Sequence, residues 1–530
     1  MIKNPILKGF NPDPSIIRVG SDYYIATSTF EWFPGVQIHH SKDLVNWKLV
    51  ARPLNRVSQL DMRGNPDSCG VWAPCLSYND GVFYLVYSNV RSFDGICKDT
   101  PNYLVTTTDI LGDWSEPIYL SSRGFDGSLF HEPKGKKWYL NMLVDHRKGK
   151  FFGGIEMQEY CPAQQMLVGD VYYLTEGSSL GLSEGPHIFF KDGFYYMIMA
   201  EGGTEYGHAM TIARSSSIYG PYEMHPNNPL VSSRNHPDNE LQKAGHGDIF
   251  QTQHGDWYAV FLIGRPISKL GKCTLGRETA IEEVIWENQW PYLKQGGCVP
   301  RTYIPTPNLK LQPFKKEEDM IRFNILELPI DFQSLRIPVS EEWCSLQARP
   351  GYLRLYGKES LASQFQQSLI ARRVQDFHVE VTTAIVFQSQ NLQQMAGLVF
   401  YYNTDHSHYA CITANYDGSE NHLSIFSANN GESSSQEELI DVTGQEKIYL
   451  KGIMHLEDLQ FYYSFDNRTY QKLGELLDAS ILSDDHVRDG SDRYRPAFTG
   501  SFVGMCCQDL AQNKNYADFE WFEYKALPLK

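Results

Sequence analysis

The chain has 530 residues, of which 42% are hydrophobic and 21% charged, with a formal net charge of -16. This length exceeds what one hydrophobic core usually supports, so we expect a folded protein of two domains. The acidic balance, without any run of Lys and Arg, excludes the electrostatic footprint of a nucleic-acid-binding protein. No stretch of roughly 18 apolar residues marks a membrane helix, so we expect neither nucleic acid nor membrane as a partner.

A fivefold repeat fills the first part of the chain. Aromatic pairs, each preceded by a glycine, begin at Tyr23, Phe83, Trp138, Tyr195 and Trp257, with spacings of 60, 55, 57 and 62 residues. Each pair begins a β-like run, and another β-like run precedes it. Two more strand candidates come after the pair. Four strands in about 50 to 60 residues is typical of a propeller blade. The sequence therefore predicts a five-bladed β-propeller over residues 1–300, because a β-sandwich lacks such a long fixed period.

The composition changes after the fifth unit. Four prolines between residues 300 and 313 and a charged run at 315–319 predict a linker over 301–319. Beyond it, stretches such as 378–387 and 395–402 alternate or run apolar, and no long helix is indicated. We therefore expect an all-β chain whose second domain, 320–530, is a β-sandwich of jelly-roll type. The ten cysteines show no CxxC pair, so we interpret them as reduced thiols without a zinc site or disulfide framework.

Equivalent positions of the repeat carry acid and base chemistry. Ten to twelve residues before the aromatic pairs stand Asp13, Trp72, Asp126, Glu184 and His246. The innermost strand of each blade begins near the central channel, so these side chains should surround one axis. Two carboxyl groups in one cleft suit the cleavage of a glycosidic bond, which needs a protonated acid and a carboxylate. A third carboxylate would hold the pKa of the acid high, although each acid taken alone could also cap a turn.

Two further residues leave more than one interpretation open. His246 could bind a cation such as calcium in the propeller channel, contact a substrate, or form a hydrogen-bonded part of the core. A single histidine makes a poor metal site. Arg277 could donate paired hydrogen bonds to sugar hydroxyls or to a carboxylate, or it could form an ordinary salt bridge.

Five motifs, taken as a set, resemble one enzyme family. They are Asn11–Ser15, Ser28–Val36, Trp72–Pro74, Phe125–His131 and Ser183–His187. They closely resemble glycoside hydrolase family 43, specifically its two-domain β-xylosidase branch, over nearly the whole chain. The resemblance implies a five-bladed propeller joined to a β-sandwich. It also implies an inverting exo-glycosidase that needs no cofactor and releases D-xylose from the non-reducing ends of short β-1,4-xylooligosaccharides during xylan degradation.

The resemblance assigns roles to the three acids. Asp13 matches the family's general base, which activates water, and Glu184 matches its general acid. Asp126 matches the residue that tunes the pKa of the acid and orients it. A base this close to Met1 leaves no room for a cleavable signal of roughly 15 to 30 residues, so we expect a cytoplasmic enzyme.

The resemblance also implies a substrate pocket. Arg277 matches an arginine that contacts substrate hydroxyls, and Phe30 and Trp72 match its apolar walls. Phe502 resembles a residue that the second domain lends to the pocket mouth. A dead-end pocket holding one or two sugar units would explain exo action. The acidic β-sheet surfaces are compatible with a homo-oligomer, either a dimer or a tetramer.

Two positions depart from the family pattern. Cys75 stands where this branch more usually has Asp, and Val144 lies where related sequences often place an aromatic residue. A more open wall at Val144 would weaken the preference for xylosides over arabinosides. An α-L-arabinofuranosidase, or an enzyme with both activities, is therefore the alternative. An alternative of another class is a non-catalytic carbohydrate-binding propeller, against which the presence of three acids argues.

Overall fold

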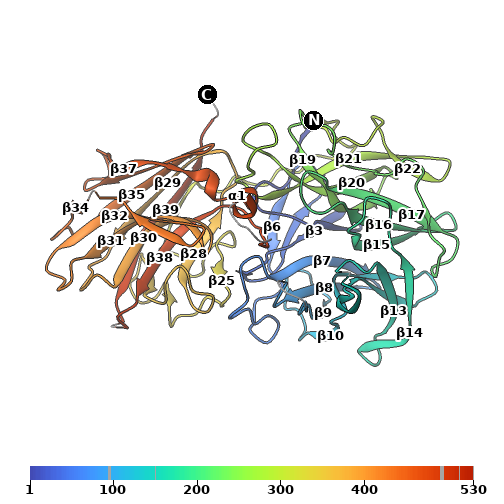
Figure 1. Ribbon diagram of the computed structural model, residues 1–530, viewed down its shortest axis with the longest axis horizontal. Helices are drawn as coiled ribbons and strands as arrows, with labels where there is room; N and C mark the ends of the chain where they lie inside the picture. The colour runs from blue at the N-terminus through green and yellow to red at the C-terminus, as the bar shows by residue number, and fades with distance from the viewer. Residues whose placement is uncertain (94–96, 150, 438, 490–494, 513, 529–530) are drawn as a thin grey trace.

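The computed structural model describes residues 1–93, 97–149, 151–437, 439–489, 495–512 and 514–528. Two β-domains lie side by side, the first running from blue to green and the second from yellow to red (Figure 1). The short helix α1 (Asp484–Asp489) lies between them in this view. Among the described residues, no helix has the length and apolar character needed to cross a membrane.

Five four-stranded antiparallel sheets form the N-terminal domain in the described chain. In chain order the blades are β2 (Ser15–Val19), β3 (Asp22–Thr27), β5 (Gln37–Ser41) and β6 (Lys48–Ala51); β7 (Gly70–Asn79), β8 (Val82–Val90), β9 (Asn102–Thr107) and β10 (Ile118–Ser121); β11 (Gly124–His131), β12 (Lys137–Leu143), β13 (Ile155–Cys161) and β14 (Met166–Thr175); β15 (Glu184–Lys191), β16 (Phe194–Glu201), β17 (Ala209–Ser215) and β18 (Glu223–Met224); β19 (Gln242–Gln251), β20 (Trp257–Gly264), β21 (Arg277–Glu287) and β22 (Trp290–Leu293). The first strands of neighbouring blades contact one another in a closed ring, from β2 through β7, β11, β15 and β19 back to β2. The predicted five-bladed propeller is therefore confirmed.

The glycine of each repeat unit lies in the turn between the first two strands of its blade. These glycines are Gly20, Gly81, Gly135, Gly193 and Gly255, and all have positive φ angles between 64° and 94°. In two blades the turn consists of two residues, Asp80–Gly81 and Asp192–Gly193, which both have positive φ. This type I′ geometry matches the twist of a hairpin and favours Asp-Gly. The repeat seen in the sequence is thus the signature of the blade hairpins.

The C-terminal domain is a sandwich of two antiparallel sheets. One sheet contains β24 (Met320–Arg322), β26 (Cys344–Ser345), β27 (Leu353–Tyr356), β29 (His378–Val386), β35 (Ile448–His455), β36 (Asp458–Ser464), β37 (Gln471–Asp478) and β39 (Tyr516–Ala526). The other contains β28 (Ser368–Arg373), β30 (Gln394–Asn403), β31 (His406–Ala414), β32 (Asn421–Asn429), β33 (Glu432–Ser435), β34 (Ile440–Asp441) and β38 (Phe502–Asp509). Buried side chains from both sheets, such as Phe400 and Phe461, form its core. This confirms the predicted sandwich.

Short strand pairings join the two domains. β1 (Ile2–Lys3) pairs with β23 (Tyr303–Ile304), so the start of the predicted linker 301–319 is held against the beginning of the chain. β4 (Trp32–Phe33) pairs with β25 (Ser334–Leu335), which connects the first blade to the residues that open the second domain. These two pairings provide hydrogen-bond partners for backbone groups at the domain boundary.

One apolar cluster also crosses this boundary. Phe10 and Trp32 of the propeller pack with Tyr401 and Phe502 of the sandwich, all of them fully buried. The rings of Trp32 and Phe502 are stacked, with their centroids 3.6 Å apart. Buried aromatic side chains contribute large apolar areas to such contacts. The sandwich is therefore anchored on the propeller by a shared core.

A buried ion pair reinforces the same boundary. Arg336, only 2% exposed, donates from Nη2 to Oδ1 of Asp67 at 2.7 Å and from Nε to the carbonyl oxygen of Asn65 at 2.8 Å. Asp67 also accepts a hydrogen bond from the backbone N–H of Thr404 in the sandwich. Charges removed from water in this way need each other as partners.

We predict that Arg336→Met lowers the free energy of unfolding by about 3 to 5 kcal/mol, because it leaves the carboxylate of Asp67 without its main partner at the domain boundary. Urea denaturation followed by tryptophan fluorescence measures this loss. The matched control is Arg63→Met, which breaks an exposed pair with Asp61 and should leave stability almost unchanged. An equal loss in both variants would contradict the prediction.

Candidate functional site

Irregular register in the inner strands directs side chains toward the channel. Register shifts occur at Trp72–Cys75 in β7, at Phe125–Ser128 in β11, at Glu184–His187 in β15 and at Gln242–Gly247 in β19. A bulge of this kind bends a strand and changes the direction of its side chains. Asp13 and Asp126 both have φ angles of 55°, a left-handed conformation that costs non-glycine residues about 1 to 3 kcal/mol and concentrates at functional sites.

The inner strands surround a cavity of about 500 Å³. Its wall includes seven of the eight residues predicted from the sequence, namely Asp13, Phe30, Trp72, Asp126, Glu184, His246 and Arg277. The eighth, Phe502, differs from the prediction, because its fully buried ring stacks on Trp32 inside the domain boundary. Among the described residues of the second domain, Phe498 is the one that lines the cavity.

Asp13 is oriented by two donors. The hydroxyl of Ser28 donates to Oδ2 at 2.6 Å, and Nη1 of Arg277 donates to Oδ1 at 3.0 Å. Arg277 also donates to the hydroxyl of Thr204 at 2.9 Å and to the carbonyl oxygen of Phe498 at 3.1 Å. The guanidinium thus joins the first blade, the fourth blade and the sandwich at one point. Its planar fork suits several acceptors at once.

The surroundings of Glu184 and Asp126 favour their protonated forms. Burial raises the pKa of Glu184 to about 8, the charge of Asp13 adds to the rise, and Arg277 opposes it. Burial also raises the pKa of Asp126 well above its ordinary value, and the charges of Glu184 and Asp13 raise it further. A carboxyl group that keeps its proton near neutral pH can act as a general acid. The cavity therefore combines a carboxyl group bound by a guanidinium with two carboxyl groups whose pKa is raised.

His246 lines the same cavity as a histidine of lowered basicity. Burial lowers its pKa to about 4, although the charge of Asp13 acts in the opposite direction. Its ring packs on Gly185, where a β-carbon would lie 2.8 Å from Nε2. In the described chain, no group of three or more His, Cys, Asp or Glu side chains is placed to hold a metal ion. Calcium prefers six to eight oxygen ligands, water among them, whereas the ring of His246 offers nitrogen.

Aromatic side chains of both domains form one wall. Trp72 lies with its ring centroid 5.9 Å from that of Phe30 and 5.3 Å from that of Phe498. Ser68 holds two of these residues: its carbonyl oxygen accepts from Nε1 of Trp72 at 2.9 Å, and its hydroxyl oxygen accepts from the backbone N–H of Phe498 at 3.0 Å. Ligand pockets commonly combine such apolar walls with a few fixed polar groups.

The cavity wall also includes residues that the sequence pattern does not indicate, such as Phe498 and Thr204. Thr204 lies between β16 and β17, and Phe498 precedes β38, so neither stands at a repeated position of a strand. No periodic signal could have identified them, and the resemblance pointed to Phe502 instead. Of the two departures from the family pattern, Cys75 is buried in β7, and Val144 packs partly buried against the cluster that contains Trp72.

Comparisons with known proteins agree with this geometry. Residues 2–291 match the family model described as glycosyl hydrolases family 43, and residues 321–525 match a β-xylosidase C-terminal concanavalin A-like domain. A β-xylosidase of Bacillus subtilis is 48% identical, with 99% of each chain covered. Xylosidase/arabinosidase 43B of Humicola insolens is 47% identical, with 99% of this chain and 97% of the relative covered. The crystal structure of a xylan β-1,4-xylosidase from Bacillus halodurans C-125 is similar, with a TM-score of 0.96, 50% identity, and 99% and 100% of the two chains covered.

We predict different effects for the two phenylalanines. Phe498→Ala should lower kcat/KM for a glycoside about 10- to 100-fold, because it removes an apolar wall of the cavity. Phe502→Ala should instead lower the free energy of unfolding by about 3 to 5 kcal/mol, because it empties a site in the shared core. Steady-state kinetics and thermal denaturation of both variants distinguish these effects. A stable Phe502→Ala protein with the larger kinetic defect would reverse the assignment.

Proposed function

Because this chain belongs to the glycosyl hydrolases of family 43, we propose that it is an inverting exo-glycosidase that releases D-xylose from the non-reducing ends of short β-1,4-xylooligosaccharides. The observation that carries the proposal is the meeting of Asp13, Asp126, Glu184 and Arg277 in one cavity, with the pKa of Glu184 raised to about 8. Membership in a hydrolase family disfavours the alternative of a sugar-binding propeller without chemistry.

The proposed reaction is a single displacement. Asp13 accepts a proton from a water molecule while the oxygen of that water forms a bond to the anomeric carbon. The bond from that carbon to the leaving oxygen breaks, and Glu184 gives its proton to this oxygen. The Ser28 and Arg277 hydrogen bonds support the role of Asp13, because they fix the position of its carboxylate. Each carboxylate oxygen has a second lone pair that can accept a proton from water.

Asp126 is proposed to tune and orient the acid. The charge of Glu184 raises the pKa of Asp126, and an electrostatic interaction of this kind is mutual, so the two groups compete for protons. Arg277 lowers the pKa of both groups and so limits the rise. The pair can therefore hold a proton near neutral pH and still release it during the reaction.

The shape of the cavity supports exo action. About 500 Å³ accommodates one or two sugar units rather than a long chain. The second domain contributes Phe498 to the wall, and the carbonyl oxygen of this residue accepts from Arg277. A pocket closed by both domains favours the end of an oligosaccharide over an internal bond.

We expect an aryl β-D-xyloside to be hydrolysed with a higher kcat/KM than an aryl α-L-arabinofuranoside with the same leaving group. The arabinofuranosidase or dual-activity alternative is kept because the relative from Humicola insolens is named for both sugars. Steady-state kinetics on the two substrates decide between them. A large arabinofuranoside preference would overturn the xylosidase proposal, while NMR detection of α-D-xylose as the first product would support inversion.

We predict that Glu184→Ala lowers kcat/KM for xylobiose about 10²- to 10⁴-fold, because the leaving oxygen no longer receives a proton. In the wild type the acid is protonated below its pKa of about 8, so activity should fall as pH rises through that value. The variant should lose this alkaline limb and keep more activity on an aryl xyloside with a good leaving group. Glu159→Ala, in the third blade, is the control that should change neither property. An unchanged rate on xylobiose would remove Glu184 as the acid.

A further inference from the structure

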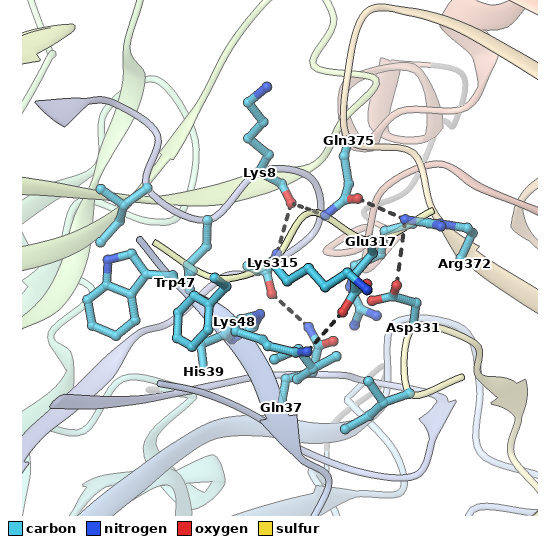
Figure 2. A pocket seen from close by; sticks show the side chains of 17 residues that line it. Lys8, Gln37, His39, Trp47, Lys48, Lys315, Glu317, Asp331, Arg372 and Gln375 are labelled. Atoms are coloured by element: carbon cyan, nitrogen blue, oxygen red, sulfur yellow. Dashed lines mark hydrogen bonds and ion pairs between the residues drawn. The ribbon is translucent and has the colours of Figure 1, made fainter. Parts of the chain in front are cut away.

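A second cavity, of about 340 Å³, lies at the boundary between the domains (Figure 2). Its wall is formed by residues within 6–11 at the start of the chain, 37–49 in the first blade, 314–317 and 330–331 after the propeller, and 372–375 in the sandwich. Among the described residues, none that lines this cavity also lines the catalytic one. The glycosidase chemistry proposed above makes no use of this cavity.

Positive charge predominates on this wall. The basic lining residues are Lys8, Lys48, Lys315, Arg372 and Arg373, and the acidic ones are Glu317 and Asp331. Figure 2 shows Lys48 against Glu317, with Nζ 3.1 Å from Oε1, and Arg372 against Asp331, with Nη2 3.8 Å from Oδ2. Lys8 pairs with Asp376, which lies outside this wall, at 2.7 Å. Within the described chain, Lys315 and Arg373 are therefore the lining cations without an ion pair.

Arg373 has a donor that lacks an acceptor. Its side chain is 5% exposed, and it donates to the carbonyl oxygen of Phe10 and to Oε1 of Gln333. Within the described chain, its Nη2 has no hydrogen-bond partner. A buried guanidinium donor without an acceptor is costly, because it has lost water without gaining a replacement.

Neighbouring groups repeat this pattern. Arg52, which is 9% exposed, donates from Nε to the carbonyl oxygen of Ile330 on the cavity wall, and both of its Nη atoms lack partners in the described residues. Nε of Arg372 and Nδ1 of the buried His39 are also unpartnered there. The charge of Arg52 lowers the pKa of Arg373, in addition to the larger effect of burial, while Asp331 opposes both. Two buried guanidinium groups therefore repel each other, that of Arg373 on the cavity wall and that of Arg52 behind it.

We propose that this cavity binds a small oxyanion of the phosphate or carboxylate class, held by Arg373 and Arg372, while Arg52 behind the wall adds positive charge. Oxyanions accept several charge-assisted hydrogen bonds at once, and planar guanidinium groups match them in pairs. An anion here would give acceptors to the orphan donors of Arg373 and Arg372 and reduce the repulsion between Arg373 and Arg52. It would also stabilise the domain boundary, because Arg373 holds the carbonyl oxygen of Phe10 and Asn11 lines the same cavity.

Titration calorimetry of the full-length protein with sodium phosphate, sodium sulfate and sodium acetate tests the proposal. We expect one saturable site for at least one of these anions, and the preferred anion identifies the phosphate or the carboxylate class. Arg373→Met and Arg52→Met should each weaken binding at least tenfold. Arg18→Met is the matched control, because this exposed arginine of the first blade bonds to the carbonyl oxygens of Gln251 and Gly20. It should leave anion binding unchanged.

Three outcomes would overturn the proposal. They are the absence of saturable binding of every anion at millimolar concentrations, equal binding by the wild type and both cavity variants, and displacement of the anion by excess xylose. The last result would place the anion in the catalytic cavity. Should Arg373→Met fail to fold, two measurements remain decisive. One is the affinity of Lys315→Met, which we expect to be reduced, and the other is a phosphate-soaked crystal of the wild type, which we expect to show the anion beside Arg373.

Discussion

The pairing of Arg277 with Asp13 is the contact on which the catalytic cavity depends. Arg277 begins β21 in the fifth blade, whereas Asp13 precedes β2 in the first blade, so their hydrogen bond spans the closure of the propeller. The same guanidinium donates to Thr204 and to the carbonyl oxygen of Phe498. The side chain of Arg277 thereby connects both domains to the carboxylate that is proposed to activate water. Because the donors of a guanidinium lie in one fixed plane, a shift of one acceptor would change the hydrogen-bond geometry at the other acceptors.

The three acids have different surroundings. Asp13 has two donors, whereas Glu184 and Asp126 lie where burial and neighbouring carboxylates favour the protonated form. This difference in surroundings supports the proposed roles of Asp13 as base and Glu184 as acid. Each acid comes from a different blade, so the ring of inner strands holds the three carboxyl groups at fixed positions relative to one another.

The second domain is part of the site rather than an attachment to it. Phe498 lines the cavity, and its backbone N–H is held by Ser68, which also accepts a hydrogen bond from Trp72. Farther from the site, Arg336 bonds Asp67, and Phe502 stacks on Trp32. The domain boundary also contains the arginine-lined cavity beside Asn11. Contacts that fix the sandwich on the propeller therefore influence the geometry around Asp13.

The sequence by itself determined the blades and the convergence of three acids on one cavity. Glycines at hairpin turns and aromatic pairs at fixed spacing are local requirements of each blade, and matched positions in a repeat converge on one axis, so the repeat alone places Asp13, Asp126 and Glu184 together. Only the tertiary structure decided that Phe498 rather than Phe502 lines the cavity and that Arg52 lies near Arg373 at the domain boundary. These outcomes depend on how two domains dock, through contacts between residues hundreds of positions apart. A repeat encodes the distance between equivalent positions, but no local pattern encodes which loop faces which across an interface.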